Sequence, residues 1–338
     1  MEYDQRRKFI LMDGRLKCME YHIPRLPENA KCKRCRSRGE IRLPSHNTIW
    51  CAGCFISYCE RAVVRAMKAF GITTDVEILV AVSGGKDSLA LWNILNSLGY
   101  RTRGLHVNLG IEGFSEASVD AVAQFAEERN LTWAQYSLKE VFGWTIDEIH
   151  CRLRRSICSV CGAVKRQMLN RLTAREGYRV LASGHNLDDE AGRLLGNLLR
   201  HRNYYIEKQY PYLPSTHPLF ATKMKPLYRL ESAELRAYCH FASIRPLSDS
   251  CPRSRGATSH FVKGALQLME EKMPGTKRDF YFTWLKQRRP PVPFDGEGIS
   301  RCRECGEPAF MEVCGVCAIR AMLNAGRKRT CNGEARDE

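Results

Sequence analysis

Short apolar runs alternate with amphipathic segments along the middle of the chain. Residues 76–82, VEILVAV, have the pattern of a buried strand, and residues 88–99, SLALWNILNSLG, that of a helix. Strands that alternate with helices indicate βαβ units and a parallel sheet. The pattern therefore predicts an α/β fold with a doubly wound, mostly parallel sheet. Further strands are expected at 102–109, 131–138 and 178–185, and further helices at 116–130, in a stretch through Leu169, and at 187–200.

Outside this alternation, apolar spacing predicts three more helices, at 55–71, 231–243 and 259–275. The last of these should end where Pro274 and Gly275 interrupt it. Residues 201–230 are basic and aromatic with several prolines, and we expect a loop there. Residues 287–298 have the composition of a linker.

These patterns divide the chain into five parts. They are a basic extension (1–31), an N-terminal cysteine module with its helix (32–72), a central domain (73–290), a C-terminal cysteine module (291–325) and a polar tail (326–338).

The charge balance indicates a polyanionic partner. The 338 residues include 53 basic and 37 acidic side chains, which gives a net charge of +16. Nucleic acid is the usual partner of such a surplus, and an anionic membrane surface is the alternative. No apolar run is long enough to cross a bilayer, and the first residues lack a signal-peptide pattern. We therefore expect a cytoplasmic location, without membrane association, where thiols stay reduced.

The sixteen cysteines are the most informative part of the composition, because ten of them form five C-x-x-C pairs. In a reducing compartment such pairs indicate metal ligands more often than disulfides. Two terminal groups have the spacing of zinc ribbons, in which metal binding supplies folding energy directly. Basic residues around the first group favour contact with RNA phosphates, and a purely structural clip is the alternative. The groups are Cys32, Cys35, Cys51 and Cys54, and Cys302, Cys305, Cys314 and Cys317.

The central cysteines differ from the two terminal groups, because there are three of them and not four. Cys158 and Cys161 lie at an expected helix start, and Cys251 follows about ninety residues later. A closed zinc site takes four ligands, whereas three thiolates suit an Fe–S cluster with one iron open to another ligand. Two alternatives stay open: a redox dithiol with Cys251 merely buried, or a zinc site completed by Cys151 or a histidine.

The segment SGGKDS, residues 83–88, connects a strand to a helix and has the composition of a phosphate-binding loop. It is not a Walker A loop, because Asp87 follows Gly85-Lys86 and Val80 stands where the first glycine belongs. Small residues at this position can direct backbone N–H groups at an anion over the helix N-terminus. The alternative is a strand–helix turn that binds no anion. A second segment, SGHNLDDE, also follows a strand, so both should share one edge of the sheet.

The string SGGKDS resembles the PP-loop of the N-type ATP pyrophosphatases, which have an adenine nucleotide alpha hydrolase-like fold. That resemblance implies cleavage of ATP between the α- and β-phosphates. The order of modules, with a ribbon, SGGKDS, LHVNLGI, CSVCG, GHNLDDEA, a late CP and a second ribbon, resembles the TtuA-type tRNA 2-thiolation enzymes over roughly residues 30 to 320. The wobble-uridine tRNA thiolases share this layout, with ribbons flanking a PP-loop domain.

The resemblance also implies roles for individual residues. Asp188 and Asp189 correspond to a catalytic or Mg²⁺-holding carboxylate, although acids are favoured at a helix start in any case. Lys165 corresponds to a lysine acting at the reacting base, and Lys86 and Asp87 to catalytic residues of the loop. Cys158, Cys161 and Cys251 correspond to the cluster ligands. The nucleotide pocket corresponds to Ser83, Gly84, Gly85, Lys86, Asp87, Ser88, His106, Ile111, Gly184 and His185.

The implied reaction is synthesis of 2-thiouridine or 2-thioribothymidine in tRNA. ATP adenylates the C2 oxygen of the base, and a sulfur nucleophile then displaces AMP. The implied cofactors are ATP, Mg²⁺, a 4Fe–4S cluster with one open iron, and two Zn²⁺. The partners are tRNA and a sulfur donor, which is a ubiquitin-like thiocarboxylate protein, a persulfide or sulfide. The family leads us to expect a homodimer.

Two alternative functions stay open. One is a PP-loop tRNA-modifying ligase with a nitrogen nucleophile and zinc, and the other is a non-catalytic zinc-ribbon RNA-binding protein.

One departure from the family pattern lies next to the second loop. Gly192 stands where a glutamine is expected, inside the helix that follows DDEA. A glycine in a helix interior costs about 1 kcal/mol relative to alanine. We therefore expect a local packing reason for Gly192.

Overall fold

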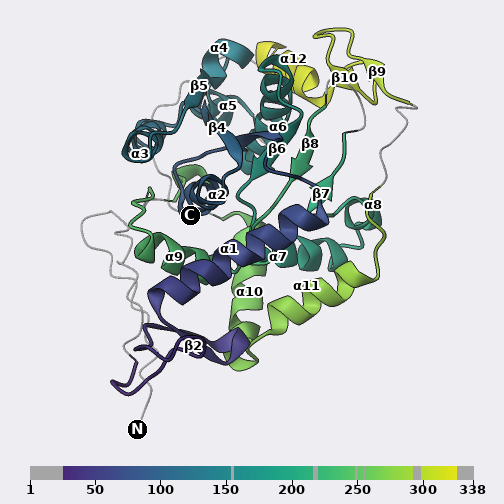
Figure 1. Cartoon of the computed structure of the whole chain (residues 1–338). Coiled ribbons are helices and arrows are strands. Elements are labelled where there is room, and N and C mark those ends of the chain that lie inside the picture. The colour runs from purple at the N-terminus through teal and green to yellow at the C-terminus, as the bar shows by residue number, and fades with distance from the viewer. Residues whose placement is uncertain are drawn as a thin grey trace, which may run out of the picture.

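The computed structural model describes residues 26–153, 156–215, 220–247, 250–254, 256–291 and 298–325. A six-stranded sheet lies at the centre of the molecule (Figure 1), in the order β5-β4-β3-β6-β8-β7. All neighbouring strands are parallel except β7 and β8, so the predicted doubly wound, mostly parallel sheet is confirmed. The strands are β3 (Glu77–Ala81), β4 (Arg101–Asn108), β5 (Trp133–Ser137), β6 (Val180–Ser183), β7 (Tyr212–Leu213) and β8 (Thr222–Met224).

The sheet separates two hydrophobic cores, because alternate residues of a strand point to opposite faces. Ile78 and Val80 of β3 belong to one core, and Leu79 belongs to the other. The first core includes side chains of α1 (Ala52–Ala69), α2 (Lys86–Ser97), α3 (Phe114–Glu128), α7 (Leu187–Leu198), α8 (Asn203–Glu207), α9 (Ser232–Phe241), α10 (Thr258–Lys272) and α11 (Thr276–Lys286). The second includes α4 (Leu138–Phe142), α5 (Ile146–Arg152), α6 (Ile157–Arg175) and α12 (Gly315–Ala325).

The position of β3 fixes where a ligand site can form. The chain leaves β3 toward β4 on one side, and later returns to β6 on the other side. Loops at the carboxyl ends of β3 and β6 therefore diverge around a topological switch point, where open α/β sheets bind ligands. The segments SGGKDS and SGHNLDDE are these two loops.

One element prediction was wrong, one helical stretch is divided, and one helix was not predicted. The range 201–230 is not a loop, since it contains α8, β7 and β8, and β8 extends the sheet through its bonds to β6. These strands have two or three residues, too few for an alternating pattern to be recognised. The helical stretch through Leu169 is divided into α4, α5 and α6, and α6 continues to Arg175. Helix α11 was missed because its sequence is rich in charges.

Small antiparallel hairpins mark the two cysteine modules. The N-terminal hairpin pairs β1 (Ile41–Leu43) with β2 (Thr48–Trp50), and the short helix η1 (Pro44–His46) connects them. The C-terminal hairpin pairs β9 (Ser300–Arg301) with β10 (Pro308–Ala309). The predictions for residues 1–25, for residues 292–297 of the linker and for the tail 326–338 lie outside the described residues. Within the described part, no helix combines the length and the apolar character that crossing a membrane requires.

Candidate functional site

The PP-loop is held in a conformation that requires glycine. Gly84 has a φ of 74°, and a Cβ at this position would lie 2.8 Å from the carbonyl oxygen of Ser118. The Ser118 hydroxyl donates a hydrogen bond of 2.7 Å to the Ser83 carbonyl oxygen. The Leu247 N–H donates another, of 2.8 Å, to the Gly84 carbonyl oxygen. Contacts from distant segments therefore fix the turn in which backbone N–H groups can face an anion.

The side chains of the loop have separate tasks. Ser88 is buried, and its hydroxyl accepts from the Ser83 N–H at 3.1 Å and donates to the Gly85 carbonyl oxygen at 2.9 Å. Ser88 therefore shapes the loop. The Lys86 ammonium lies 2.7 Å from the Asp87 carboxylate, and Lys86 begins helix α2. A cation and a helix N-terminus at one point favour a negatively charged ligand.

The loop after β6 lies directly against the PP-loop, as the sheet topology predicts. A Cβ on Gly184 would lie 2.8 Å from the backbone nitrogen of Ser88, so glycine is required for this approach. The Asn186 side-chain amide donates a 3.1 Å hydrogen bond to Asp87, and Asn186 also caps helix α7. Sequence reasoning missed Asn186 and Ser118, which connect the loops. The capping pattern of Asn186 with Asp189 was the available signal for Asn186.

The two aspartates after Asn186 point to different neighbours. Asp188 accepts from the Ser232 N–H at 2.7 Å and from the buried Lys277 ammonium at 2.6 Å, so its carboxylate joins α7 to α9 and α11. Asp189 accepts from the Asn186 N–H at 3.0 Å and pairs with Lys263 of α10. Burial by itself raises the pKa of Asp189, but Lys263, His185 and the Asn186 N–H together outweigh this effect, and the net pKa is lowered. Both acids are engaged by cations of the protein.

Two histidines lie close to these loops. The buried His106 ring faces the Val82 carbonyl oxygen through Nδ1 at 2.9 Å. Since a carbonyl oxygen accepts, Nδ1 carries the proton and Nε2 is left as an acceptor, which has no partner among the described residues. Desolvation lowers the pKa of His106, and the charge of Lys165 lowers it further. The Nδ1 atom of His185 and the Ser183 hydroxyl form a 2.8 Å hydrogen bond. Desolvation lowers the pKa of His185 as well. Ile111 is buried below the same edge.

The three central cysteines come together in space. Cys158 lies in the first turn of α6, Cys161 in the second, and the Cys158 thiol donates to the Arg253 carbonyl oxygen at 3.5 Å, two residues after Cys251. Burial raises the pKa of Cys161, and repulsion from Cys251 and Cys158 raises it further. The sulfurs are nevertheless not within 4.8 Å of one another as a group, unlike the terminal clusters.

Lys165 connects the cysteines with the nucleotide loops. It follows Cys161 by one helical turn, and its charge lowers the pKa of Cys161 against the effect of burial. The same charge contributes to the lowered pKa values of His106 and His185. One ammonium group therefore acts electrostatically on residues of the cysteine group and of both nucleotide-side histidines.

The terminal cysteines form two compact groups of four. In each group all the sulfur atoms lie within 4.8 Å of one another, with Cys35 and Cys51 3.5 Å apart and Cys305 and Cys314 3.8 Å apart. Tetrahedral zinc with Zn–S bonds of about 2.3 Å places its sulfurs about 3.8 Å apart. Backbone N–H groups, first that of Cys314, lower the pKa of Cys302 to about 6, which favours the thiolate that zinc binds. The arrangement fits a zinc ion in each module.

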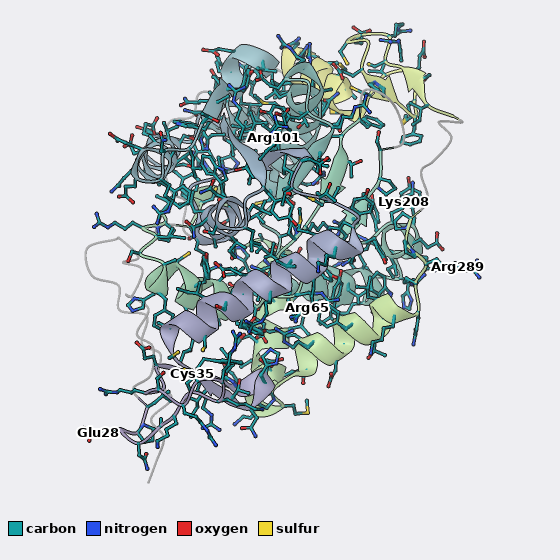
Figure 2. The ribbon with its side chains drawn as sticks, in the orientation of Figure 1. Glu28, Cys35, Arg65, Arg101, Lys208 and Arg289 are labelled. Carbon is teal, nitrogen blue, oxygen red and sulfur yellow. The ribbon has the colours of Figure 1, made fainter. Side chains whose placement is uncertain are left out.

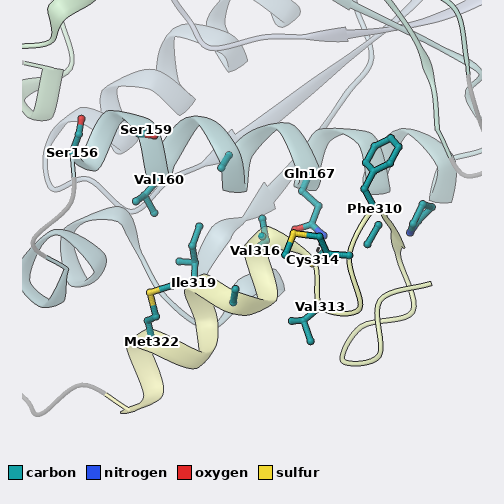
Figure 3. A pocket seen from close by; sticks show the side chains of 16 residues that line it. Ser156, Ser159, Val160, Gln167, Phe310, Val313, Cys314, Val316, Ile319 and Met322 are labelled. Atoms are coloured by element: carbon teal, nitrogen blue, oxygen red, sulfur yellow. Dashed lines mark hydrogen bonds between the residues drawn. The ribbon is translucent and has the colours of Figure 1, made fainter. Parts of the chain in front are cut away.

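An apolar cavity that sequence reasoning did not anticipate lies between α6 and the C-terminal module. Its volume is about 830 Å³. Figure 3 shows α12 below α6, with Val160 and Ile319 pointing into the space between the two helices. Phe310 and Met311 at its rim are largely exposed. The cavity places the C-terminal module against the helix that carries Cys158 and Cys161.

Comparison with known proteins agrees with this geometry. A PP-loop domain model matches residues 59–265, and a model of the 2-thiouridine synthetase TtuA N-terminal LIM domain matches residues 31–56. The chain is 37% identical over 302 residues to the tRNA-5-methyluridine(54) 2-sulfurtransferase of Thermotoga maritima, covering 89% of this chain and 99% of that protein. It is 38% identical over 301 residues to the protein of that name from Thermus thermophilus, covering 88% and 94%. The solved U34-tRNA thiolase NcsA from Methanococcus maripaludis, with its 4Fe–4S cluster, is similar at a TM-score of 0.74 and 26% identity, covering 89% and 98%.

Proposed function

Because this chain belongs to the PP-loop family of tRNA 2-sulfurtransferases, we propose that it synthesises 2-thiouridine or 2-thioribothymidine in tRNA. It is an enzyme that uses ATP to activate the C2 oxygen of a uracil ring and then replaces that oxygen with sulfur. The observation that carries the proposal is that residues on either side of Cys251 contact both parts of the site. The Leu247 N–H donates to the Gly84 carbonyl oxygen of the PP-loop at 2.8 Å, and the Arg253 carbonyl oxygen accepts from Cys158 at 3.5 Å. Sulfur chemistry and ATP chemistry therefore meet at one site.

The first step that we propose is adenylation. The base O2 attacks the α-phosphorus of ATP, the bond to the β-phosphate oxygen breaks, and pyrophosphate leaves. The N–H groups of residues 83–85 and the ammonium of Lys86 face the departing phosphates, and a bound Mg²⁺ would offset their charge. Since Lys86 contacts Asp87 at 2.7 Å, a bound phosphate or Mg²⁺ competes for that pair. His106 and Ile111 line the adenine side, and Gly184 and His185 complete the pocket.

The second step replaces the activated oxygen. Sulfur adds to C2, and AMP leaves with the former O2 as one of its phosphate oxygens. Cys158, Cys161 and Cys251 would hold a 4Fe–4S cluster, which supplies an open iron that keeps a hydrosulfide in its nucleophilic form. The described thiols suit such a group because three of them converge, whereas each terminal zinc ribbon has four. Lys165 faces the negative charge that develops on the base.

We assign different roles to Asp188 and Asp189. Asp188 is committed to Lys277 and Ser232, which suits a structural role. Asp189 reaches the side of α7 that adjoins His185 and Lys263, and it is the better candidate for a carboxylate that helps to hold Mg²⁺. A change of Asp189 to Asn should therefore lower the rate of adenylation more than it lowers the folding stability.

The remaining assignments are also proposals. Two Zn²⁺ ions hold the terminal ribbons, and the chain is divided as the sequence predicts, at residues 31/32, 72/73, 290/291 and 325/326. The exposed Lys33, Arg34 and Arg36 of the first ribbon contact tRNA phosphates. The sulfur donor is a ubiquitin-like thiocarboxylate protein, a persulfide or sulfide. The enzyme acts in the cytoplasm as a homodimer.

Anaerobic reconstitution tests the cluster. Wild-type protein incubated with iron and sulfide should gain a broad visible absorbance and about four irons per chain, and the Cys158→Ala variant should not. Cys59→Ala is the matched control, because it removes one thiol from the core of the molecule and leaves the cysteine group intact. Wild-type protein that stays colourless and binds zinc alone would support the alternative, a ligase with a nitrogen nucleophile.

A further inference from the structure

A basic and aromatic surface lies beside the site, where the end of α7, helix α8 and the C-terminal module meet. Figure 1 shows α8 at the edge of the molecule below β9 and β10, and Figure 2 labels Lys208 there. The Lys208 ammonium lies 4.0 Å from the ring centre of Tyr204 and 5.7 Å from that of Phe310. This one lysine therefore connects α8 with the C-terminal ribbon. We define the basic–aromatic surface as Arg200, Arg202, Tyr204, Tyr205, Lys208 and Phe310.

The rings of this surface are open to solvent. Tyr204 is 60% exposed, Tyr205 51% and Phe310 65%. The rings of Tyr204 and Tyr205 are 5.5 Å apart and nearly perpendicular, so their faces point in different directions. An ordinary solvated helix end carries charged residues without large exposed rings. Exposed rings interleaved with cations are instead the composition of surfaces that stack nucleobases.

The surface is continuous with the cysteine site through Arg166. A Cβ on Gly162, the residue after Cys161, would lie 3.0 Å from the Arg166 guanidinium, so this side chain lies over the second turn of α6. Arg166 is also within electrostatic reach of Arg193 and of Tyr205. A line of groups thus runs from the cysteines, over Arg166, to α8.

The cations along this line lack protein counter-ions. Among the described residues, Arg166, Arg193 and Lys223 form no ion pair with a carboxylate. Desolvation lowers the pKa of Lys223, and the charge of Arg166 adds to that effect. Mutually repelling cations beside an enzyme site are compensated when an anionic ligand lies across them.

We propose that the basic–aromatic surface binds an unpaired stretch of RNA that flanks the reacting nucleotide. This inference rests on the proposed function and deepens it by assigning the surface that presents the tRNA. Bases stack on Tyr204 and Tyr205, while phosphates lie on Arg200 and Lys208 of the surface and on the adjoining Arg166. The strand is single because the faces of paired bases are covered in a helix, and single-stranded loops are the parts of RNA that aromatic side chains read.

Substitution at the exposed rings tests the stacking. Tyr204→Ala combined with Tyr205→Ala should raise the Kd for tRNA at least fivefold for each base that no longer stacks on a tyrosine ring. The matched control is Tyr204→Phe combined with Tyr205→Phe, which keeps both rings and should bind within twofold of wild type. Lys208→Ala should lower the slope of log K against log salt by about 0.7, and Lys208→Arg should keep it.

The readouts separate this inference from the proposed function. ATP affinity and iron content should be unchanged in the alanine variants, while KM for tRNA rises. Short single-stranded RNA should compete with tRNA for wild-type protein more strongly than duplex RNA of the same length, and this preference should fall in the alanine variants. If wild type thiolates tRNA and the alanine variants bind it equally well, the assigned surface is wrong and the function stands. If wild type neither binds nor thiolates tRNA, both are wrong.

Discussion

Glycine at position 84 is required by two independent constraints, a φ of 74° and a carbonyl oxygen 2.8 Å from the place of a Cβ. Gly84→Ala should therefore destabilise the protein by about 1–2 kcal/mol for the left-handed backbone, and the clash with Ser118 adds to this. ATP binding should fall much more than stability, because the turn that directs the N–H groups is lost. Thermal unfolding and ATP titration check the two effects separately.

Gly99 provides the matched control for that prediction. It also has a positive φ, of 79°, but nothing lies within 4 Å of a Cβ placed there. Gly99→Ala should show the backbone cost alone and bind ATP like the wild type. Equal ATP affinity in Gly84→Ala and Gly99→Ala would contradict the role given to the loop.

At the residue scale, the sequence pattern is informative where one short segment carries a whole candidate site. Ser83 to Ser88 and the terminal cysteines are such cases, since their spacing alone indicates an anion or a metal ligand. Ser118 and Asn186 could not be found in this way. Each acts on a loop of another segment, and a single sequence contains no record of that approach. The expected packing reason for Gly192 is visible, because a Cβ there would lie 2.9 Å from Lys263.

At the element scale, helix α7 is held by three ion pairs on its first turn, one to α11, one to α10 and one to Lys225. Lys277 is buried, and its ammonium lies 2.6 Å from Asp188. Lys277→Met should destabilise the protein by about 3–5 kcal/mol, because removing one partner leaves the other charge buried without compensation. Chemical denaturation measures this loss.

The double variant Lys277→Met with Asp188→Asn is the control. It should recover a large part of the lost stability, since neither charge is then left alone. No recovery would mean that Lys277 stabilises α11 through its other contacts, such as that with Gln267 at 2.7 Å.

Elements of regular period could be predicted, and those without it could not. The strands β3 and β4 and the helices α2 and α7 were found because each repeats an apolar pattern over several residues. The strands β7 and β8 have only two and three residues. They are strands because they pair with the sheet, and not because of a pattern in their own sequence. Helix α11 buries Lys277 against acids of other elements, and such compensation does not appear as an apolar pattern.

For the whole molecule, a buried polar cluster attaches the N-terminal module to the central domain. Tyr58 of α1 donates to Glu234 at 2.9 Å and accepts from Arg278 at 2.9 Å. In the same cluster, the pKa of Glu231 is raised to about 7. Burial is the largest cause, and the nearby Glu234 and Glu270 add to it, while Lys277 lowers the pKa. The cluster connects α1, α9, α10 and α11 around one set of charges.

The raised pKa of Glu231 gives the molecule a specific pH dependence. A carboxyl with a higher pKa in the folded state holds its proton more tightly there, so its contribution to stability is lost as pH rises toward about 7. Between pH 5.5 and 8, wild type should lose on the order of 2 kcal/mol of unfolding free energy relative to Glu231→Gln. Denaturation of both proteins at each pH measures the difference. A constant difference over this range would show that Glu231 is ionised throughout.

The central claim is that ATP cleavage and cysteine-held sulfur chemistry act together on a tRNA base. Nucleoside analysis of unmodified tRNA, after incubation with reconstituted protein, ATP and sulfide, tests it most directly. We predict one thionucleoside formed for each AMP released, no ADP, and no thionucleoside with Cys158→Ala. ADP as the product, or equal thiolation by Cys158→Ala, would contradict the account.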